Sequence, residues 1–438
     1  MYLTKVTAII TTYNTEGYIA ETINNISKQT LSDIQVIIVD DYSTDSTIQI
    51  INEICRNDPR FLVLVNEDNR GAGYSRNRGL QYAHGEYIIF LDDDDIYSLD
   101  MLETAYKQAS DNNADILVFR SNNLDDDSGI VTETAWTIAS DSLPEEKKFN
   151  ALQMKNNFFR NFIWWAWDKL ISHELIIRSG LKFQEIRTTN DLYFVCAIML
   201  QAEEITVCDD ILITHRDNRA GSLSNTREIS YYCSLEAIKK LDDFLTRHPE
   251  LYPLRKNYNN YSVEFLSWSL STLKSWEAYE KFYMLIRSFY QQSPLLSASD
   301  FESDYLAEQY QHFISGTPEH MLMALKCRLE QDVRHTHQLN THNQNQLNKN
   351  QKNLDKMITV TEEYKYQLQL LEGQKNEMVQ ALGQHIEQKS QLEQELQHTE
   401  DQKQRFETQT KQYQEELGRL QNSFCGKLIL LLSGESKS

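Results

Sequence analysis

Four consecutive aspartates, Asp92 to Asp95, directly follow the apolar run 87–91 and are the clearest chemical feature of the chain. A run of β-branched and aromatic residues is typical of a buried strand, and strand ends are where α/β sheets bind ligands. Adjacent like charges repel one another unless a cation neutralises them. Asp92 and Asp94 are two residues apart and can present both side chains to one side. This arrangement suits a divalent cation whose remaining positions are open to phosphate, although a solvated acidic loop is the alternative.

Three polar stretches flank the acidic turn, and each lies at or just after the end of a predicted strand: Thr11–Asn14, Val39–Asp45 and Asn69–Gly79. A carboxylate such as Asp41 in this position can accept hydrogen bonds from a base or from ribose hydroxyls, or it can cap the next helix. Arg76 could hold a diphosphate, or it could simply be solvated on its helix.

The elements that must position these residues alternate along the first part of the chain. Continuous apolar strands separated by helices of about 10–15 residues indicate a parallel sheet covered on both faces. We expect caps for the first two helices at Asn14 or Thr15 and at Ser43 or Thr44. The predicted strands are 6–12, 34–39, 61–65, 87–91 and 114–119, and the predicted helices are 15–29, 43–55, 73–83 and 101–110.

Later segments differ in character. Residues 150–224 contain an aromatic block, a predicted helix at 191–201 and a predicted strand at 211–215, and residues 229–325 have a helical pattern. We predict an α/β domain at 1–227, an α-helical domain at 228–326, a coiled coil at 327–422 and a short apolar or disordered tail at 423–438.

A heptad pattern supports the predicted coiled coil. With Leu347 at position d, fourteen of the twenty-two a and d positions from Leu347 to Leu420 are apolar. A repeat sustained over this length is typical of a coiled coil, and we expect homo-oligomerisation through it. A long single helix and a Gln-rich disordered tail are the alternatives. The apolar run 428–432 beyond it could contact a membrane surface or cap the coil.

Composition excludes several classes of protein. The formal net charge is −21; residues 1–326 carry 29 basic and 48 acidic side chains, and the remainder carries 14 and 16. This balance argues against a nucleic-acid-binding surface. The six cysteines form no C-x-x-C pair, which favours a reducing cytoplasm. No run approaches the roughly 18 apolar residues of a membrane span, and we expect no secretion signal.

The segments ITTYN, VDDYSTD, NRGAGYSRNRG and FLDDDD, in this order, resemble the family 2 glycosyltransferases. The resemblance covers about residues 4–225. It implies a GT-A fold, which is Rossmann-like with a mixed, mostly parallel sheet, and an inverting, Mn²⁺- or Mg²⁺-dependent transferase that uses a nucleotide-sugar donor.

The resemblance also assigns roles to residues of the four segments. It places the metal-binding pair on Asp92 and Asp94. The nucleotide-binding residues that it implies are Thr11, Tyr13, Asp41, Arg76, Asp92 and Asp93.

Three downstream segments resemble the family as well. In Thr189-Asn190-Asp191, Asn190 stands where a Glu is usual, which leaves Asp191 as the candidate general base, or else as a helix N-cap. The segment 167–170 resembles a W-x-K-L element under the acceptor site, and the segment 215–224 resembles a loop that closes over the diphosphate. The remaining implied contacts with donor, acceptor or metal are Trp165, Arg216, Arg219, Ser222 and His215.

These features predict a glycosyltransferase that uses a UDP-sugar and acts on a glycan, lipid-linked or protein-linked acceptor in bacterial surface-glycan synthesis. We expect it in the cytoplasm, at the inner face of the membrane. The alternative is not an enzyme but a scaffold protein, in which an inactive GT-A domain assembles through its coiled coil. A nucleotidyltransferase has less support, because no Gly-rich, Lys-bearing phosphate loop opens the chain.

Overall fold

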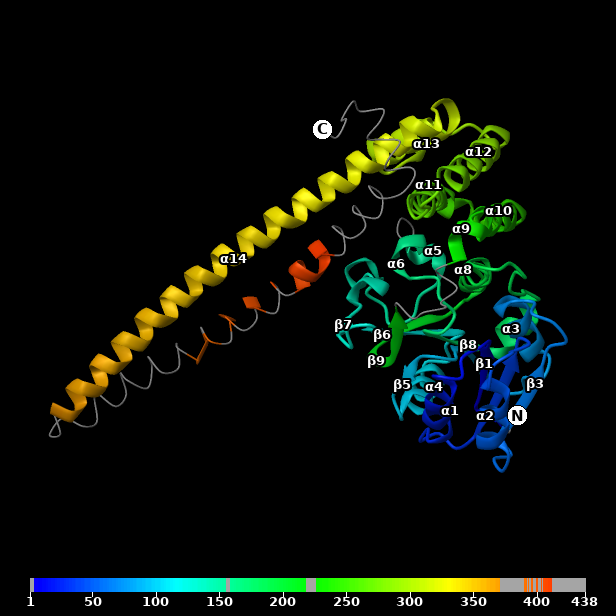
Figure 1. The fold of residues 1–438 in the computed structure, drawn as a ribbon, viewed down its shortest axis with the longest axis horizontal. Coiled ribbons are helices and arrows are strands. Elements are labelled where there is room, and N and C mark those ends of the chain that lie inside the picture. Colours follow the sequence, from blue (N-terminus) through cyan, green and yellow to red (C-terminus); the bar gives the residue numbers. More distant parts are fainter. Residues whose placement is uncertain are drawn as a thin grey trace. The chain divides into compact units, whose positions relative to one another are not determined.

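The continuous apolar runs form the strands of one sheet in the computed structural model, which describes residues 4–154, 158–217 and 226–370 and isolated positions between 390 and 411. The order of the hydrogen-bonded strands within this described part is β3-β2-β1-β4-β8-β6-β9-β5, and β7 pairs with β6 (Figure 1). The strands are β1 (Val6–Thr12), β2 (Ile34–Asp40), β3 (Phe61–Val65), β4 (Tyr87–Asp92), β5 (Ile96–Tyr97), β6 (Ile116–Asp125), β7 (Val131–Glu133), β8 (Lys169–Ser172) and β9 (Ile205–Asp217).

The sheet is mixed. The pairs β1–β2, β1–β4, β2–β3 and β6–β9 are parallel, whereas β8 runs antiparallel between β4 and β6. The predicted GT-A class, with a mixed and mostly parallel sheet, is confirmed in this architecture. The strand β8 was not predicted, because its four residues are too few to show a period.

Helices cover both faces of the sheet. Side chains alternate across a strand, so Val6, Ala8 and Ile10 of β1 join the core formed with α1, α2 and α4, whereas Ile9 meets α3 at Gly79. The first eight helices are α1 (Ile19–Ser27), α2 (Thr47–Cys55), α3 (Ala72–Leu80), α4 (Met101–Asp111), α5 (Ala151–Met154), α6 (Phe158–Asn161), α7 (His173–Ser179) and α8 (Leu192–Gln201), with the 3₁₀ turns η1 (Ala135–Thr137) and η2 (Ser140–Ser142).

The predicted caps of the first two helices are wrong. The helix α1 follows Tyr18 and α2 follows Ser46, and neither cap residue makes a side-chain capping bond. The reason is that the expected caps connect two loops instead. The Asn14 amide N–H donates to Ser43 Oγ at 2.9 Å, and the Asn14 side-chain oxygen accepts from the Thr44 amide at 2.8 Å.

A second group of helices follows the sheet. It comprises α9 (Arg227–Ser230), α10 (Tyr232–Arg247), α11 (Arg255–Ser271), α12 (Trp276–Gln292) and α13 (Asp304–Ser315), with η4 (Pro249–Leu254) and η5 (Ala298–Asp300). Residues 1–273 and 277–315 form one compact unit. Within it, Phe159 of α6 stacks on Tyr261 of α11, and the Phe159 amide donates to Asn257 Oδ1 at 2.8 Å. Residues on the two sides of the predicted boundary at residue 227 therefore pack against each other.

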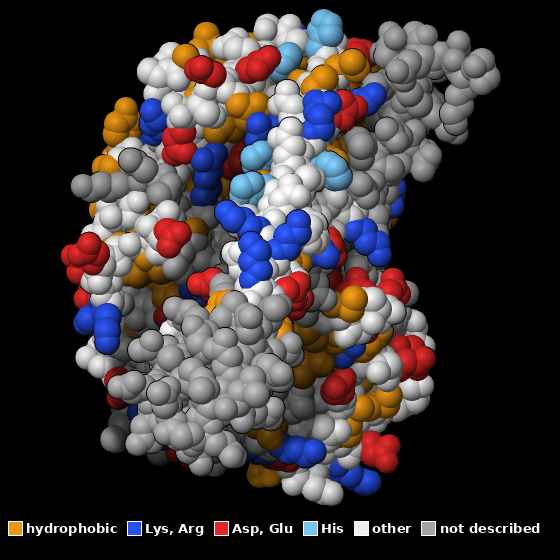
Figure 2. Space-filling view, turned by 90° about the vertical axis from the view of Figure 1, so that its left-hand side faces the viewer, with side chains coloured by type: hydrophobic (Ala, Val, Ile, Leu, Met, Phe, Trp, Pro, Cys, Tyr) orange, Lys and Arg blue, Asp and Glu red, His pale blue; other side chains and the backbone are white. Residues whose placement is uncertain are grey.

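The other unit comprises residues 274–276 and 316–438, and its described part contains α14 (Pro318–Leu370). Exposed His335, His337 and His342 lie along this helix, and Figure 2 shows histidine and basic side chains on it. The helix covers the first predicted heptads, whereas the tail 423–438 lies outside the described residues. In the described part of the chain, no helix combines the length and apolar character needed to cross a bilayer.

Candidate active site

The carboxyl ends of three neighbouring strands bring the predicted motifs together. Thr12 at the end of β1 is in register with Asp40 of β2, and Thr11 is in register with Asp92 of β4. Because the strands are parallel, the segments that follow them emerge at the same edge of the sheet. Motifs that are far apart in the sequence therefore come together at this edge of the sheet.

Asp93 and Asp95 of the acidic turn contact different parts of the structure. Asp93 faces the loop after β1, where its Oδ2 accepts from Thr15 Oγ1 at 2.6 Å and from the Tyr13 amide at 3.3 Å. Asp95 is buried, and its Oδ1 accepts hydrogen bonds from β9. Asp92 and Asp94 are half-buried. The buried Tyr97 hydroxyl donates to the Asp92 carbonyl at 2.6 Å and supports the backbone of the acidic turn.

Arg76 connects the acidic turn to the segment that carries Asp191. Its Nη2 lies 2.9 Å from Asp92 Oδ1, and its Nη1 donates to Asn190 Oδ1 at 2.7 Å. The guanidinium is buried, and within the described part of the chain its Nε has no hydrogen-bond partner. The neutral Asn190 amide thus satisfies one edge of the cation, and the Asp92 carboxylate balances its charge.

Asp41 organises the loop that leads into α3. Its Oδ2 accepts from the Gly71 amide at 2.7 Å, and its Oδ1 accepts from the Arg70 amide at 2.9 Å and from Asn66 Nδ2 at 2.6 Å. Asp41 is 4% exposed. Asp41 is predicted to face a nucleoside base. Sequence reasoning missed a second role that the structure shows: the Asp41 carboxylate fixes the backbone of the loop that leads to Arg76.

Asp191 stands directly before α8. It occupies the N-cap position, yet its side chain makes no capping hydrogen bond. Burial raises the pKa of the Asp191 carboxyl above its ordinary value, and the nearby positive charge of Arg76 partly opposes this rise. A carboxylate that is desolvated and is not used as a cap has the properties of a general base.

His215 and Arg216 connect the end of β9 to the acidic turn. His215 Nδ1 lies 2.8 Å from Asp95 Oδ1; burial disfavours the charged ring, but Asp95 outweighs it and raises the pKa of His215 to about 9. The Arg216 guanidinium donates to Asp126 at 2.7 Å and to the Asp94 carbonyl at 2.9 Å. In this arrangement Arg216 supports the turn, whereas Arg219 and Ser222 lie outside the described residues.

Trp165 belongs to an aromatic stack beside His215. It stacks on Trp167 with ring centroids 4.7 Å apart, and Trp167 stacks on His215 at 5.0 Å. The buried Lys169 ammonium supports this segment because it donates to the Trp165 carbonyl at 3.0 Å and lies 2.5 Å from Asp168 Oδ1. Burial, opposed by Lys169, raises the pKa of Asp168 to about 6.

Backbone strain marks two further residues of the site. Tyr42 has φ of 68° and Thr189 has φ of 59°, a region that bulky and β-branched residues rarely adopt. Strain of this kind clusters at functional sites. Tyr42 follows Asp41 and is 51% exposed, while Tyr13 is 44% exposed. Sequence reasoning selected Tyr13 and missed Tyr42, for which the only signal was its place between Asp41 and Ser43.

The donor atoms near the acidic turn bear on the predicted metal. Among the described residues, no set of three His, Cys, Asp or Glu side chains could hold an ion. Asp95 Oδ2 is a buried acceptor that no described residue donates to, and Asp92 and Asp94 are half-buried. Such a sparse set of oxygens fits a hard cation that completes its coordination with substrate phosphates.

Comparison with known proteins defines the class of this site. Residues 7–172 match the model of Glycosyl transferase family 2, so this part of the chain is a family 2 glycosyltransferase domain.

Individual relatives and one solved structure extend this match. Glycosyltransferase GlyG of Streptococcus pneumoniae is 29% identical over 266 residues, which cover 58% of this chain and 85% of GlyG. Cholesterol galactosyltransferase of Borreliella burgdorferi is 26% identical over 300 residues, covering 63% and 80%. The crystal structure of S. aureus TarS has a TM-score of 0.54 at 21% identity, and the match covers 71% of this chain and 53% of TarS. The likeness to TarS concerns the fold.

The buried Asp168–Lys169 pair provides a test of how the aromatic stack is supported. We predict that Lys169→Met lowers the free energy of unfolding by about 3–5 kcal/mol, because it leaves a buried carboxylate unpaired. The folded-state pKa of Asp168 then rises further above its unfolded value, so the loss is larger at pH 8 than at pH 5. Urea unfolding at both pH values measures this effect. The double variant Asp168→Asn/Lys169→Met is the control and should recover part of the loss; unchanged stability of Lys169→Met would contradict the prediction.

Proposed function

We propose that the chain transfers a sugar, with inversion, from a UDP-sugar to a hydroxyl group of a glycan, lipid-linked or protein-linked acceptor. The observation that carries this proposal is the Arg76 bridge, which joins the acidic turn through Asp92 to the segment of Asp191 through Asn190. One buried cation thus keeps a candidate phosphate-binding turn and a candidate base in a fixed relation. The family 2 domain match supports the same activity.

Asp191 acts in this proposal on the acceptor hydroxyl. Its carboxylate takes the hydroxyl proton while the acceptor oxygen forms a bond to C1 of the sugar. The bond between C1 and the diphosphate oxygen breaks, its electron pair leaves with the nucleoside diphosphate, and the transition state is oxocarbenium-like. Displacement from the opposite face inverts the anomeric centre.

The donor side uses the other predicted residues. Thr11, Tyr13, Asp41 and Asp93 line the nucleoside, and Arg76 lies near the ribose or diphosphate. Asp92 and Asp94 would hold Mn²⁺ or Mg²⁺ together with the donor phosphates. When bound, the cation neutralises charge on the departing diphosphate. His215 would reach the metal only through Nε2, because its Nδ1 is engaged by Asp95.

The acceptor side and the cellular setting rest on the family resemblance and on the heptad pattern. We place the reaction in bacterial surface-glycan synthesis, at the cytoplasmic face of the membrane. The coil of residues 327–422 assembles several copies, so that several sites act on one acceptor at a raised effective concentration.

The first prediction concerns the two carboxylates with the clearest roles. Asp94→Ala and Asp191→Ala should each lower UDP release from the preferred UDP-sugar, with Mn²⁺ and acceptor present, by at least about 10²-fold, the lower range for loss of a general base. A coupled UDP assay measures the rates. Glu203→Gln, an exposed carboxylate at the far end of α8, is the matched control and should retain wild-type turnover. Wild-type turnover in either alanine variant would remove the corresponding role, whereas absence of UDP release from the wild-type chain would favour the inactive scaffold.

The second prediction concerns pH. Asp191 must be ionised to act as a base, so kcat should fall as the pH drops through its raised pKa. Arg76→Met removes the charge that opposes this rise, so the acidic limb should move to higher pH. Full pH profiles of kcat provide the measurement, and Arg70→Met, on an exposed arginine of the loop before α3, is the control. An unmoved limb in Arg76→Met would show that this charge does not act on the base.

The third prediction concerns assembly. Truncation after Lys326 should give a monomer that still hydrolyses the donor but extends a polymeric acceptor less well. Sedimentation of the full and truncated chains measures the oligomeric state. A truncated chain that still assembles would show that residues outside the coil hold the copies together.

A further inference from the structure

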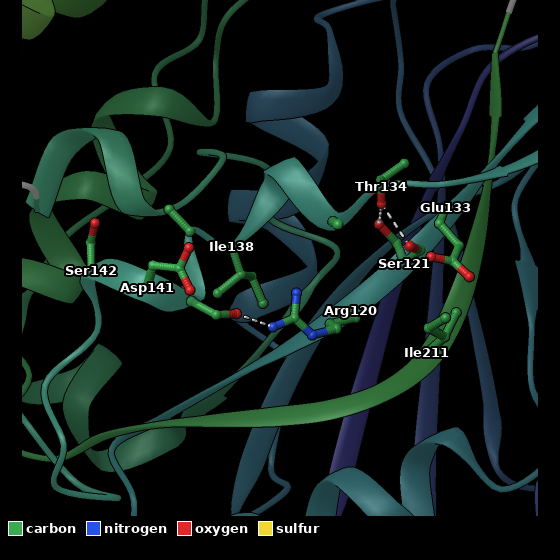
Figure 3. Close-up of a pocket in the computed structure, with 11 residues that line it drawn as sticks. Arg120, Ser121, Glu133, Thr134, Ile138, Asp141, Ser142 and Ile211 are labelled. Atoms are coloured by element: carbon green, nitrogen blue, oxygen red, sulfur yellow. Dashed lines mark hydrogen bonds between the residues drawn. The ribbon is translucent and has the colours of Figure 1, made fainter. Parts of the chain in front are cut away.

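A pocket lies apart from the residues assigned to the donor. It has a volume of about 560 Å³, within the range of ligand-binding cavities. It is formed where β6 and β9 meet β7 and the turns η1 and η2 (Figure 3). The lining residues are Arg120, Ser121, Glu133, Thr134, Ala135, Ile138, Ala139, Ser140, Asp141, Ser142 and Ile211.

The polar groups of this pocket are held in place by its own walls. Arg120 donates to Ser140 Oγ and forms an ion pair with Asp209 at 3.1 Å. The hydroxyls of Ser121 and Thr134 lie 2.9 Å apart. Figure 3 shows Arg120 and Ile138 between the side of Asp141 and Ser142 and the side of Glu133 and Ile211.

This chemistry favours a neutral ligand rich in hydroxyl groups. The Arg120 charge is already balanced by Asp209, and the carboxylates of Glu133 and Asp141 would repel an anion. Apolar side chains such as Ile138 and Ile211 provide surfaces for C–H groups. Serine and threonine hydroxyls can donate and accept hydrogen bonds, and carboxylate oxygens can accept them. A saccharide presents both kinds of surface.

An exposed tryptophan adjoins the pocket. Trp136 follows Ala135 in η1 and is 63% exposed. Its ring contacts Trp165 edge-on at 5.9 Å, and Trp165 in turn lies 5.5 Å from the His215 ring. A row of aromatic rings therefore runs from His215, beside the acidic turn, to Trp136, whose chain neighbour Ala135 lines the pocket. An indole face attracts C–H groups of a ligand and loses little conformational entropy when it is covered.

We propose that Trp136 and this pocket bind a saccharide unit of the acceptor that is remote from the reacting hydroxyl. The acceptor is accordingly a chain of several sugars, of which one unit reaches Asp191 and another covers Trp136. This inference rests on the proposed function and specifies its acceptor class. Two ring contacts, Trp136–Trp165 and Trp165–His215, connect this platform to the residues beside the acidic turn.

The experiment uses the full chain labelled with 5-fluorotryptophan. Its six tryptophans give ¹⁹F signals that are assigned with single Trp→Phe variants. The probes are glucose, galactose and N-acetylglucosamine and the linear β-linked tetrasaccharide of each. We expect at least one tetrasaccharide to shift the Trp136 signal and to bind at least about tenfold more tightly than its monosaccharide.

Variants separate the pocket from the rest of the molecule. Trp136→Ala removes the platform and Ala135→Leu fills the pocket from an exposed backbone position; each should weaken tetrasaccharide binding by about tenfold, or about 1.4 kcal/mol. Trp268→Ala, on an exposed tryptophan of α11, is the control and should bind like the wild type. Calorimetric UDP binding should be the same in all of these chains.

Two outcomes overturn the inference. Either no tetrasaccharide shifts the Trp136 signal, or Trp136→Ala and Ala135→Leu bind the tetrasaccharide as tightly as the wild type. Failure of the proposed function has a different signature, because the wild-type chain would then bind no UDP whatever the saccharides do.

Discussion

The site depends on one buried cation, Arg76, placed between two segments that each carry negative charge. Burying a guanidinium costs free energy, which a balancing charge and hydrogen-bond acceptors offset. Asp92 supplies the charge and Asn190 supplies a neutral acceptor. Asp41 fixes the loop before α3, and α3 fixes Arg76. The acidic turn, the loop after β2 and the start of α8 are therefore held in place through one side chain.

Much of the fold could be predicted because its signals are local. Continuous apolar runs gave β1 and β3 with their observed bounds and gave β2 and β4 to within one residue. The motifs at the strand ends were expected to meet, because parallel strands end at a common edge. The later strands were harder to recognise. The bulge between Phe119 and Ser121 breaks the period of β6, and β8 is too short to have one.

Contacts over long sequence separations could not be predicted. Nothing in the segment Thr189-Asn190-Asp191 indicates that Asn190 binds an arginine 114 residues earlier. Likewise, Asp93 and Asp95 belong to the same acidic run, but Asp93 binds the loop after β1 and Asp95 binds β9. Asp92, Asp93 and Asp95 thus have different partners although they lie in one run of like charges. The loop containing Arg219 and Ser222 stays a prediction.

The left-handed backbone at Tyr42 and Thr189 has a consequence for the evolution of the protein. Each such residue stores roughly 1–3 kcal/mol, which the surrounding contacts must offset. Natural proteins have only a small reserve of stability, so this stored energy is a sizeable share of it. Replacements that relax the backbone at Tyr42 and Thr189 would raise the free energy of unfolding but would also change the geometry of the site. Thermal stability and the geometry of the site therefore trade off against each other in this molecule, and selection for one lowers the other.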